Sequence, residues 1–248
     1  MARLFNGITQ QITAGTRQVP TDGSFSGWWY PTFSQNDALL HVLFFNRTDA
    51  SNEFGIYKHT TNNLVAGWFT EGTDYSLQVP TANYALNTNA WNHLAMTWRN
   101  GFFAPEIYLN GVALGFGPVN TTTHATTGIN ILGNTSLNEG DASGRIAEFA
   151  FWNRVLAVDE VTMLAAGMSP LFLIAGTELG QGLQNYWPLI VELQDYISVD
   201  NVGTNVGTTA ANDHPFMFYP QGIPANPTPV EVEADSHVVW NYKRRKAG

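Results

Sequence analysis

The chain of 248 residues contains no cysteine, which excludes disulfides and thiolate-bound metals, and its folding needs no oxidising compartment. Basic side chains are scarce as well: eleven Lys and Arg stand against twenty Asp and Glu, a formal net charge of −9. Four of the basic residues are adjacent, at 243–246, so residues 1–220 hold seven basic and seventeen acidic side chains. Because a body this acidic repels nucleic acid and anionic membranes, we expect no specific nucleic-acid binding.

Long apolar runs are also missing. None approaches the roughly twenty residues that a membrane-spanning helix needs, so we expect no membrane span. Residues 1–7 have neither the basic nor the apolar region of a signal peptide. We therefore expect a protein made in a cytoplasm, which would reach the outside of a cell only by a route other than the general secretory pathway.

The familiar catalytic patterns are absent too. The sequence has no nucleophile elbow, no phosphate-binding glycine loop and no His-Glu-x-x-His motif. Its six histidines are scattered without metal-ligand spacing. We expect a protein that is not an enzyme, has no certain cofactor, and packs His93 in its core or in an interface.

What the sequence does contain is a series of short strand patterns. Turn signals recur every eight to fifteen residues, the spacing of an all-β sandwich. One segment, 157–167, has apolar residues at helical spacing with acids in its first turn and Gly167 at its end, and a second short helix is expected at 171–175. The expected strands are 3–14, 25–33, 38–45, 54–59, 64–69, 92–99, 105–110, 129–132 and 145–153.

The most informative of these patterns is a hairpin in the middle of the chain. Leu94, Met96 and Trp98 alternate with smaller or polar residues. Ile107 and Leu109 repeat this pattern in the following strand. Asn110-Gly111 then forms a tight-turn dipeptide, because both residues tolerate a positive φ. The segment predicts two paired strands with one apolar face.

After Pro220 the composition changes to prolines, small residues and Glu, which predicts an extended tail over 221–248. The tail ends in an apolar, aromatic and basic patch that a solvated tail seldom keeps. We expect this patch to dock by strand addition, on this subunit or on a neighbour, although a solvated cluster of terminal charge is the alternative for its basic end. The docking residues are Val238, Val239, Trp240, Tyr242, Lys243, Arg244, Arg245 and Lys246.

Four blocks occur in order along the chain: Phe5-Asn6-Gly7, the strand 25–31, the hairpin 91–111, and the strand 144–156 that leads into a helix. Together they resemble laminin-G-like, concanavalin A-like jelly rolls. The segment 183–216 resembles the ending of such proteins in phage and bacterial genomes, where the chain returns to pair near the first strand. The resemblance implies an all-β, two-sheet antiparallel jelly-roll sandwich over 1–220, with one short helix and the extended tail. In that family the fold binds glycans and proteins, and only sometimes cleaves glycans.

Glycan binding by a jelly roll needs aromatic rings beside amides and carboxylates. Five residues in loop-rich sequence could supply them, with burial in the core as the alternative for each aromatic: Trp68, Asp74, Tyr75, Asn83 and Tyr84. The tryptophans at 28, 29, 91, 98 and 152 fall in the family-like strands, where we expect them in the core.

Laminin-G-like domains often bind calcium at a loop rim, through the oxygen ligands that this hard cation prefers. The loop 133–144 offers Asn134, Asn138, Glu139 and Asp141, and an ordinary polar loop is the alternative. Glycosidases of this fold place several acids on one strand face. Here Glu148 is a lone acid in its strand, and the sequence contains no such cluster.

These observations and the resemblance favour a non-enzymatic virion protein that decorates a phage capsid or tail, with glycan adhesion as an added role. The tail would join it to virion proteins or to further copies of itself. One alternative is a soluble, calcium-dependent carbohydrate-binding lectin module, and another is a glycoside hydrolase that acts on polysaccharides.

Overall fold

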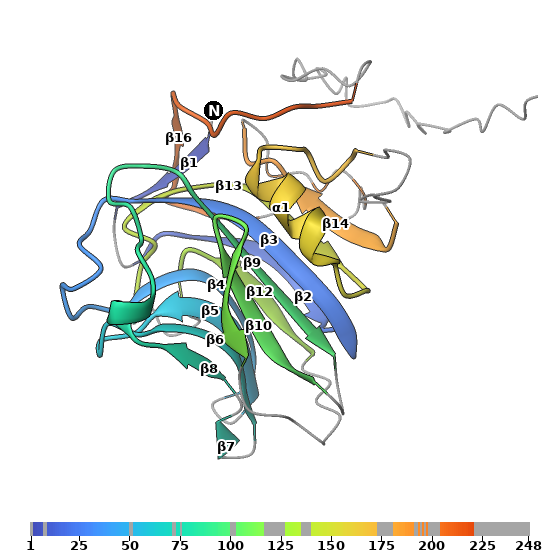
Figure 1. The fold of residues 1–248 in the computed structure, drawn as a ribbon. Helices are drawn as coiled ribbons and strands as arrows, with labels where there is room; N and C mark the ends of the chain where they lie inside the picture. The colour runs from blue at the N-terminus through green and yellow to red at the C-terminus, as the bar shows by residue number, and fades with distance from the viewer. Residues whose placement is uncertain are drawn as a thin grey trace, which may run out of the picture.

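The computed structural model describes residues 2–6, 9–49, 52–70, 73–74, 76–99, 103–116, 127–134, 140–172, 181–190, 193, 195, 197 and 204–220. Within these residues the chain forms two antiparallel sheets packed face to face, as the sequence predicted (Figure 1). In the described part of the chain, one helix, α1 (Val158–Ala165), and one 3-10 turn, η1 (Thr81–Asn83), accompany the strands. No helix among the described residues is long and apolar enough to cross a membrane.

The first sheet has the strand order β11-β10-β9-β3-β13-β1-β16, with β14 also paired to β13. Its strands are β1 (Ala2–Phe5), β3 (Asp22–Pro31), β9 (Asn92–Arg99), β10 (Phe103–Leu109), β11 (Val112–Phe116), β13 (Gly144–Trp152), β14 (Leu183–Trp187) and β16 (Thr209–Ala211).

The second sheet has the order β15-β2-β12-β4-β5-β6-β7, with β8 also paired to β6. Its strands are β2 (Gln11–Gln18), β4 (His41–Asp49), β5 (Asn52–Lys58), β6 (Leu64–Thr70), β7 (Thr73–Asp74), β8 (Leu77–Val79), β12 (Thr127–Leu132) and β15 (Thr204–Val206).

The predicted central hairpin is confirmed. Met96 pairs with Ile107 and Leu94 with Leu109, so the apolar faces of β9 and β10 coincide. Asn110 and Gly111 have φ angles of 51° and 81°, and they form the tight turn. The turn leads into β11, a strand that the sequence did not predict.

Two strand predictions were wrong. The expected strand 3–14 is split into β1 and β2, which lie in different sheets, because the chain crosses from one layer to the other after Asn6. The expected strand 38–45 begins only at His41, since Ala38 has a φ of 56° that breaks the extended backbone. Of the second expected helix, residues 171–172 are not helical and the remainder lies outside the described residues.

The core between the sheets is aromatic. Phe44 of β4 lies 5.2 Å from Phe149 and 5.0 Å from Phe151 of β13, measured between ring centroids. Phe54 of β5 meets Trp98 of β9 in a T-shaped contact at 4.9 Å. Each pair joins the two sheets, and stacked or edge-on rings add to the burial of apolar area. These contacts fix the face of each strand that points inward.

Tryptophans of the family-like strands divide between this core and the outer face of the first sheet. Trp29 and Trp98 are buried in the core, and Trp152 is buried beneath α1. Trp28 and Trp91 are half-buried on the outer face, beside Ala147 and Leu4. The expectation of core positions therefore holds for three of the five.

A β-bulge in β13 explains the position of Glu148. The pairing of β13 with β3 shifts between Ala147 and Ala150, and Glu148 has a φ of 55°. The extra residue lets Ile146, Phe149 and Phe151 all face the core. The carboxylate thereby leaves the aromatic interior, although Glu148 is only 1% exposed.

Outside the core, Glu148 holds the end of the described chain against the first sheet. It accepts hydrogen bonds from the hydroxyls of Tyr186 and Tyr219, the latter at 2.7 Å. His214 Nε2 lies 3.0 Å from Glu148 Oε1, while Nδ1 donates to the Pro215 carbonyl. The chain reaches this point after β16 has paired with β1, which confirms the predicted return to the first strand.

Helix α1 covers the same outer face. Glu160, in its first turn, accepts a hydrogen bond from the Ala157 amide and a bidentate pair from Arg154 at 2.7 and 2.8 Å. Burial alone would raise the pKa of Glu160, but these donors outweigh it and lower the pKa. Beyond the helix, the Phe218 amide donates to the Gly167 carbonyl at 2.7 Å, and the Ser169 amide donates to the Phe218 carbonyl at 2.9 Å. The C-terminal segment 213–219, α1 and the sheet thus form one packed unit.

An ionic cluster lies where β4 begins and β5 ends. The Lys58 ammonium is fully buried and donates to Asp37 and to the Leu39 carbonyl. His41 contacts Asp37 at 2.7 Å and Asp141 at 3.3 Å, and its ring stacks on Phe33. Burial alone would raise the pKa of Asp37, but the hydrogen bonds from Lys58, the Leu39 amide and His41 lower it. We call Asp37, His41, Lys58 and Asp141 the rim cluster.

We expect Asp37→Asn to lower the free energy of unfolding by about 3 kcal/mol at neutral pH, because it leaves the Lys58 ammonium buried without its counter-charge. The pKa of Asp37 is lower in the folded protein than its ordinary value of 3.8. Its contribution is therefore present above pH 3.8 and is lost as the pH falls through the lowered value. Urea denaturation at several pH values should show the difference between wild type and variant shrinking in acid.

The control for this variant is Asp22→Asn. The Asp22 side chain is 47% exposed and lies 3.8 Å from Arg99, so its loss should change the free energy of unfolding little. Equal stability of Asp37→Asn and wild type at neutral pH would contradict the role given to the rim cluster.

We expect Glu148→Gln to lower the free energy of unfolding by about 2 kcal/mol, because an amide donor would face the hydroxyl donors that now share the carboxylate. Glu106→Gln is the matched control, since Glu106 accepts from Tyr108 at a half-buried position and should cost less. Chemical denaturation measures both variants. An effect of Glu148→Gln no larger than that of Glu106→Gln would show that Glu148 does not hold the C-terminal segment.

Candidate functional site

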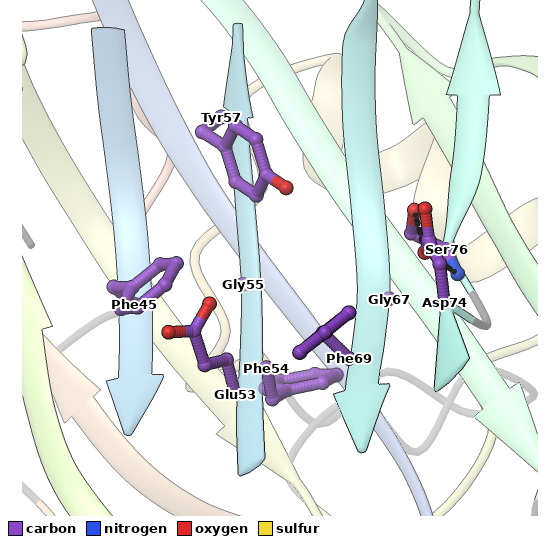
Figure 2. A pocket seen from close by; sticks show the side chains of 9 residues that line it. All are labelled: Phe45, Glu53, Phe54, Gly55, Tyr57, Gly67, Phe69, Asp74 and Ser76. Atoms are coloured by element: carbon purple, nitrogen blue, oxygen red, sulfur yellow. Dashed lines mark hydrogen bonds between the residues drawn. The ribbon is translucent and has the colours of Figure 1, made fainter. Parts of the chain in front are cut away.

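The outer face of the second sheet carries a groove. It crosses β4, β5 and β6 and reaches β7 and the residue before β8, and its volume is about 200 Å³. In Figure 2 the side chains surround a bare central floor, with Tyr57 at one end and Glu53 and Phe69 at the other. The lining residues are Phe45, Glu53, Phe54, Gly55, Tyr57, Gly67, Phe69, Asp74 and Ser76.

The floor exists because two glycines are neighbours across the strands. Gly55 pairs with Phe45 on one side and with Gly67 on the other. A Cβ atom on Gly55 would lie 2.8 Å from both the Phe44 carbonyl oxygen and a carbon of the Phe45 ring. Gly67 has a φ of 139°, which side-chain-bearing residues rarely adopt. The ring of Phe45 can therefore lie close to the backbone and leave the floor open.

Aromatic side chains form the walls. Phe45 is 6% exposed, and its ring centroid lies 6.2 Å from that of Tyr57 in an edge-to-face contact. Phe69, at the other end, is 37% exposed and faces solvent with much of its ring. An apolar ring open to water beside a narrow floor is suited to stack on a flat ligand of similar size.

Two carboxylates complete the groove. Asp74 accepts hydrogen bonds from the Ser76 amide at 2.8 Å, the Ser76 hydroxyl at 2.6 Å and the Gln78 side-chain amide at 2.9 Å. Glu53 lies opposite Phe69 in the sheet and pairs with Arg47 at 3.2 Å. These partners hold both carboxylates at the groove, where carboxylate oxygens are able to accept hydrogen bonds from a ligand.

The electrostatic environment of Tyr57 reflects these carboxylates. Burial first, and then the negative charges of Asp74 and Glu53, raise the pKa of Tyr57 to about 12. Its hydroxyl therefore keeps its proton at any physiological pH and can both donate and accept a hydrogen bond.

Of the five residues predicted for glycan binding, three have described side chains, and one of these three lines this groove. Asp74 does so, whereas Asn83 lies exposed in η1 and Tyr84 is buried, with its hydroxyl donating to the Asn62 carbonyl at 2.8 Å. Trp68 belongs to β6, where it pairs with Phe54, and its side chain lies outside the description. Tyr75 lies wholly outside the described residues. The structure thus places Asp74 at the groove and Asn83 and Tyr84 away from it, and the rest of the set stays a prediction.

The sequence signal that was missed is the alternation along two successive strands, β5 and β6. Glu53, Gly55 and Tyr57 share one face of β5, and Gly67 and Phe69 share the same face of β6. Period-two spacing of aromatic, glycine and acidic residues could have indicated this face. What it could not indicate is the register that sets Gly55 beside Gly67.

The residues predicted to bind calcium are only partly described. Asn134 is buried and bridges to Asp141, while Asp141 is half-buried and turned toward His41 in the rim cluster. Asn138 and Glu139 lie outside the described residues. Among the part of the chain that the structure describes, no group of three or more His, Asp or Glu is placed to hold a metal ion. The calcium site stays a prediction.

Two further predictions concern the C-terminal tail and His93. All docking residues of the tail, 238–246, lie outside the described residues. His93 is fully buried on the outer face of the first sheet, with its ring 5.2 Å from that of Trp28, as expected for a packing residue. Burial lowers the pKa of His93 to about 3, so its imidazole is neutral at physiological pH.

Comparisons with known proteins agree with this architecture. A pentraxin from Limulus polyphemus, heptameric and similar to serum amyloid P component, superposes with a TM-score of 0.57 at 14% identity, over 84% of this chain and 93% of that chain. A proposed carbohydrate-binding protein from Bacteroides ovatus gives a TM-score of 0.61 at 15% identity, over 84% of this chain and 59% of that chain. At such identities the likeness concerns the fold alone.

A search of curated proteins by sequence found no match. The family model of the concanavalin A-like lectin/glucanase superfamily, in its laminin-G form, matches residues 6–162. That range covers more than half of the chain and includes all four sequence blocks except the first residue of one. The chain therefore belongs to the concanavalin A-like lectin/glucanase superfamily.

Proposed function

We propose that this protein is a carbohydrate-binding jelly roll that holds glycans without cleaving them, and that the groove of the second sheet is its site. The observation that carries the proposal is the arrangement of aromatic rings and carboxylates around a bare glycine floor. Sugars combine apolar ring faces with hydroxyl donors, so they need an aromatic surface and nearby hydrogen-bond acceptors. The groove supplies both.

The size of the groove indicates that it contacts only a short part of a glycan chain. At about 200 Å³ it is smaller than the pockets of roughly 300–1,000 Å³ that enclose drug-sized ligands. A single sugar unit would lie on the floor, with Phe69 against its ring face and Asp74 and Tyr57 at its hydroxyls. The rest of a glycan chain would remain outside.

The relatives support the same class of function. The superfamily takes its name from lectins and glucanases, and the Bacteroides ovatus protein of the same fold is a proposed carbohydrate binder. Fold alone does not decide function, so the argument remains with the groove.

Hydrolysis is the second candidate, because Glu53 and Asp74 line one groove and a glycosidase needs two carboxyl groups. Their partners favour binding instead. Glu53 is paired with the Arg47 guanidinium, and Asp74 is held by three donors, so neither has the apolar enclosure that keeps a general acid protonated.

A role in a virion is a narrower proposal. It is supported by the sequence resemblance to phage proteins and by the aromatic and basic end of the tail, which would join the domain to capsid or tail proteins or to another copy of itself. The alternative is a soluble lectin module, which would use the same groove without such a partner. If it is calcium-dependent, as the sequence suggests, the ion would bind at the loop 133–144.

We expect Phe69→Ala to weaken binding of the full chain to glycans at least tenfold, because it removes the exposed ring from the groove. Glycans are first identified on an array of neutral, amino and acidic oligosaccharides, and dissociation constants are then measured by isothermal titration calorimetry. Phe216→Ala is the matched control, since Phe216 is an exposed ring on the C-terminal segment. Equal losses of glycan affinity in both variants would show that the groove is not the binding site.

The same oligosaccharides also separate binding from hydrolysis. We expect no release of reducing sugar after long incubation with the protein. Release that disappears in both Glu53→Gln and Asp74→Asn would establish the glycosidase instead.

We expect removal of residues 221–248 to abolish assembly with virion proteins or self-association, and to leave glycan binding unchanged, because the groove lies on the second sheet. Sedimentation of full-length and shortened chains measures self-association, and incorporation into particles measures assembly. Full incorporation of the shortened chain would show that the tail is not the anchor.

A further inference from the structure

The groove is not only aromatic but negatively charged. Glu53 stands between β4 and β5 at one end, and Asp74 stands beyond β6 on the other side of the glycine floor (Figure 2). None of the described lining residues is basic. Arg47 offsets one of the two charges through its contact with Glu53, so the groove keeps a negative excess on the side of Asp74.

The charges of both carboxylates act on the Tyr57 hydroxyl at one end of the groove. After burial, they are the causes that raise the pKa of Tyr57. A group that lies between Tyr57 and Asp74 therefore experiences a negative potential, in a site partly shielded from solvent by Phe45 and Phe69. Such a position penalises a carboxylate and favours a cation.

The aromatic rings favour the same kind of charge. Ammonium groups are attracted to the faces of Tyr and Phe rings within about 6 Å, and the attraction grows when the cation is partly desolvated. Here Tyr57 and Phe69 flank the floor from opposite ends, while Asp74 lies to the side with a fixed carboxylate. Aromatic faces and a carboxylate together match an ammonium group on a sugar ring.

Resting on the proposed function, we infer that the groove selects sugar units that carry a free, protonated amino group. The sugar ring would stack on Phe69, and its ammonium would donate hydrogen bonds to Asp74 within the field of Glu53. An N-acetylated unit loses the charge and gains bulk above the glycine floor. A uronic acid brings a second negative charge to an already acidic site.

The test uses the full chain and three probes of equal length: glucosamine oligomers, N-acetylglucosamine oligomers and galacturonic acid oligomers. Calorimetry is performed at a mildly acidic pH, where the amines are protonated and the carboxylates ionised. We expect glucosamine oligomers to bind about tenfold more tightly than the N-acetylated oligomers, a difference of about 1.4 kcal/mol. Galacturonic acid oligomers should not bind. The preference should shrink as the ionic strength rises from about 0.05 M to about 0.5 M.

Because the whole chain is acidic, a polycation could also bind without using the groove. Asp74→Asn is therefore compared with Asp159→Asn, which removes the same charge from the exposed start of α1 on the other sheet. We expect Asp74→Asn to abolish the tenfold preference and Asp159→Asn to retain it. A second variant, Glu53→Gln, should weaken the preference. It tests the effect of charge without altering the hydrogen bonds around Asp74.

Three outcomes would overturn the inference. Equal affinity for glucosamine and N-acetylglucosamine oligomers would refute amine selection but leave glycan binding in the groove standing. Equal effects of Asp74→Asn and Asp159→Asn would assign the preference to net charge alone. Absence of binding to these probes and to every glycan of the array would refute the proposed function itself.

Discussion

The packing of aromatic rings between the two sheets is the constraint on which the rest of the structure depends. Phe25, Phe44 and Phe149 lie within 5.2 to 6.0 Å of one another and join β3, β4 and β13 across the layers. Since successive side chains of a strand alternate between its faces, each inward ring determines which neighbours point outward. The core thus decides which residues lie on the outer faces of the sheets, but it does not restrict which side chains those residues carry.

Strand β13 shows how strictly this constraint acts. A regular alternation would point Glu148 into the aromatic interior, where an ionised carboxylate without partners is strongly unfavourable. The bulge turns Glu148 outward at the cost of a positive φ, and the hydroxyls of two tyrosines then donate to its carboxylate. The bulge that keeps Glu148 out of the core thereby also places its carboxylate where it holds the C-terminal segment through Tyr219.

The two outer faces serve different ends as a result. Helix α1 and the segment 213–219 cover the outer face of the first sheet and leave little of it open where they pack. On the second sheet the paired glycines and the surrounding rings leave a groove whose floor is formed by strands β5 and β6. A site built on strands is held rigidly, which suits a protein that binds a ligand by shape and charge.

From its sequence alone this chain could be assigned to the all-β class, to the concanavalin A-like family, and to a hairpin at 92–109 that ends in Asn110-Gly111, because period-two patterns and turn residues are local signals. Asp74 was predicted as an acid in loop-rich sequence, and the structure places it at the groove. The tertiary structure alone decided that 3–14 divides between two sheets, that Asp141 turns toward His41, and that Gly55 lies beside Gly67 among the rings of the groove. Strand register and layer crossing arise from contacts between residues far apart in the chain, and local patterns carry no information about them.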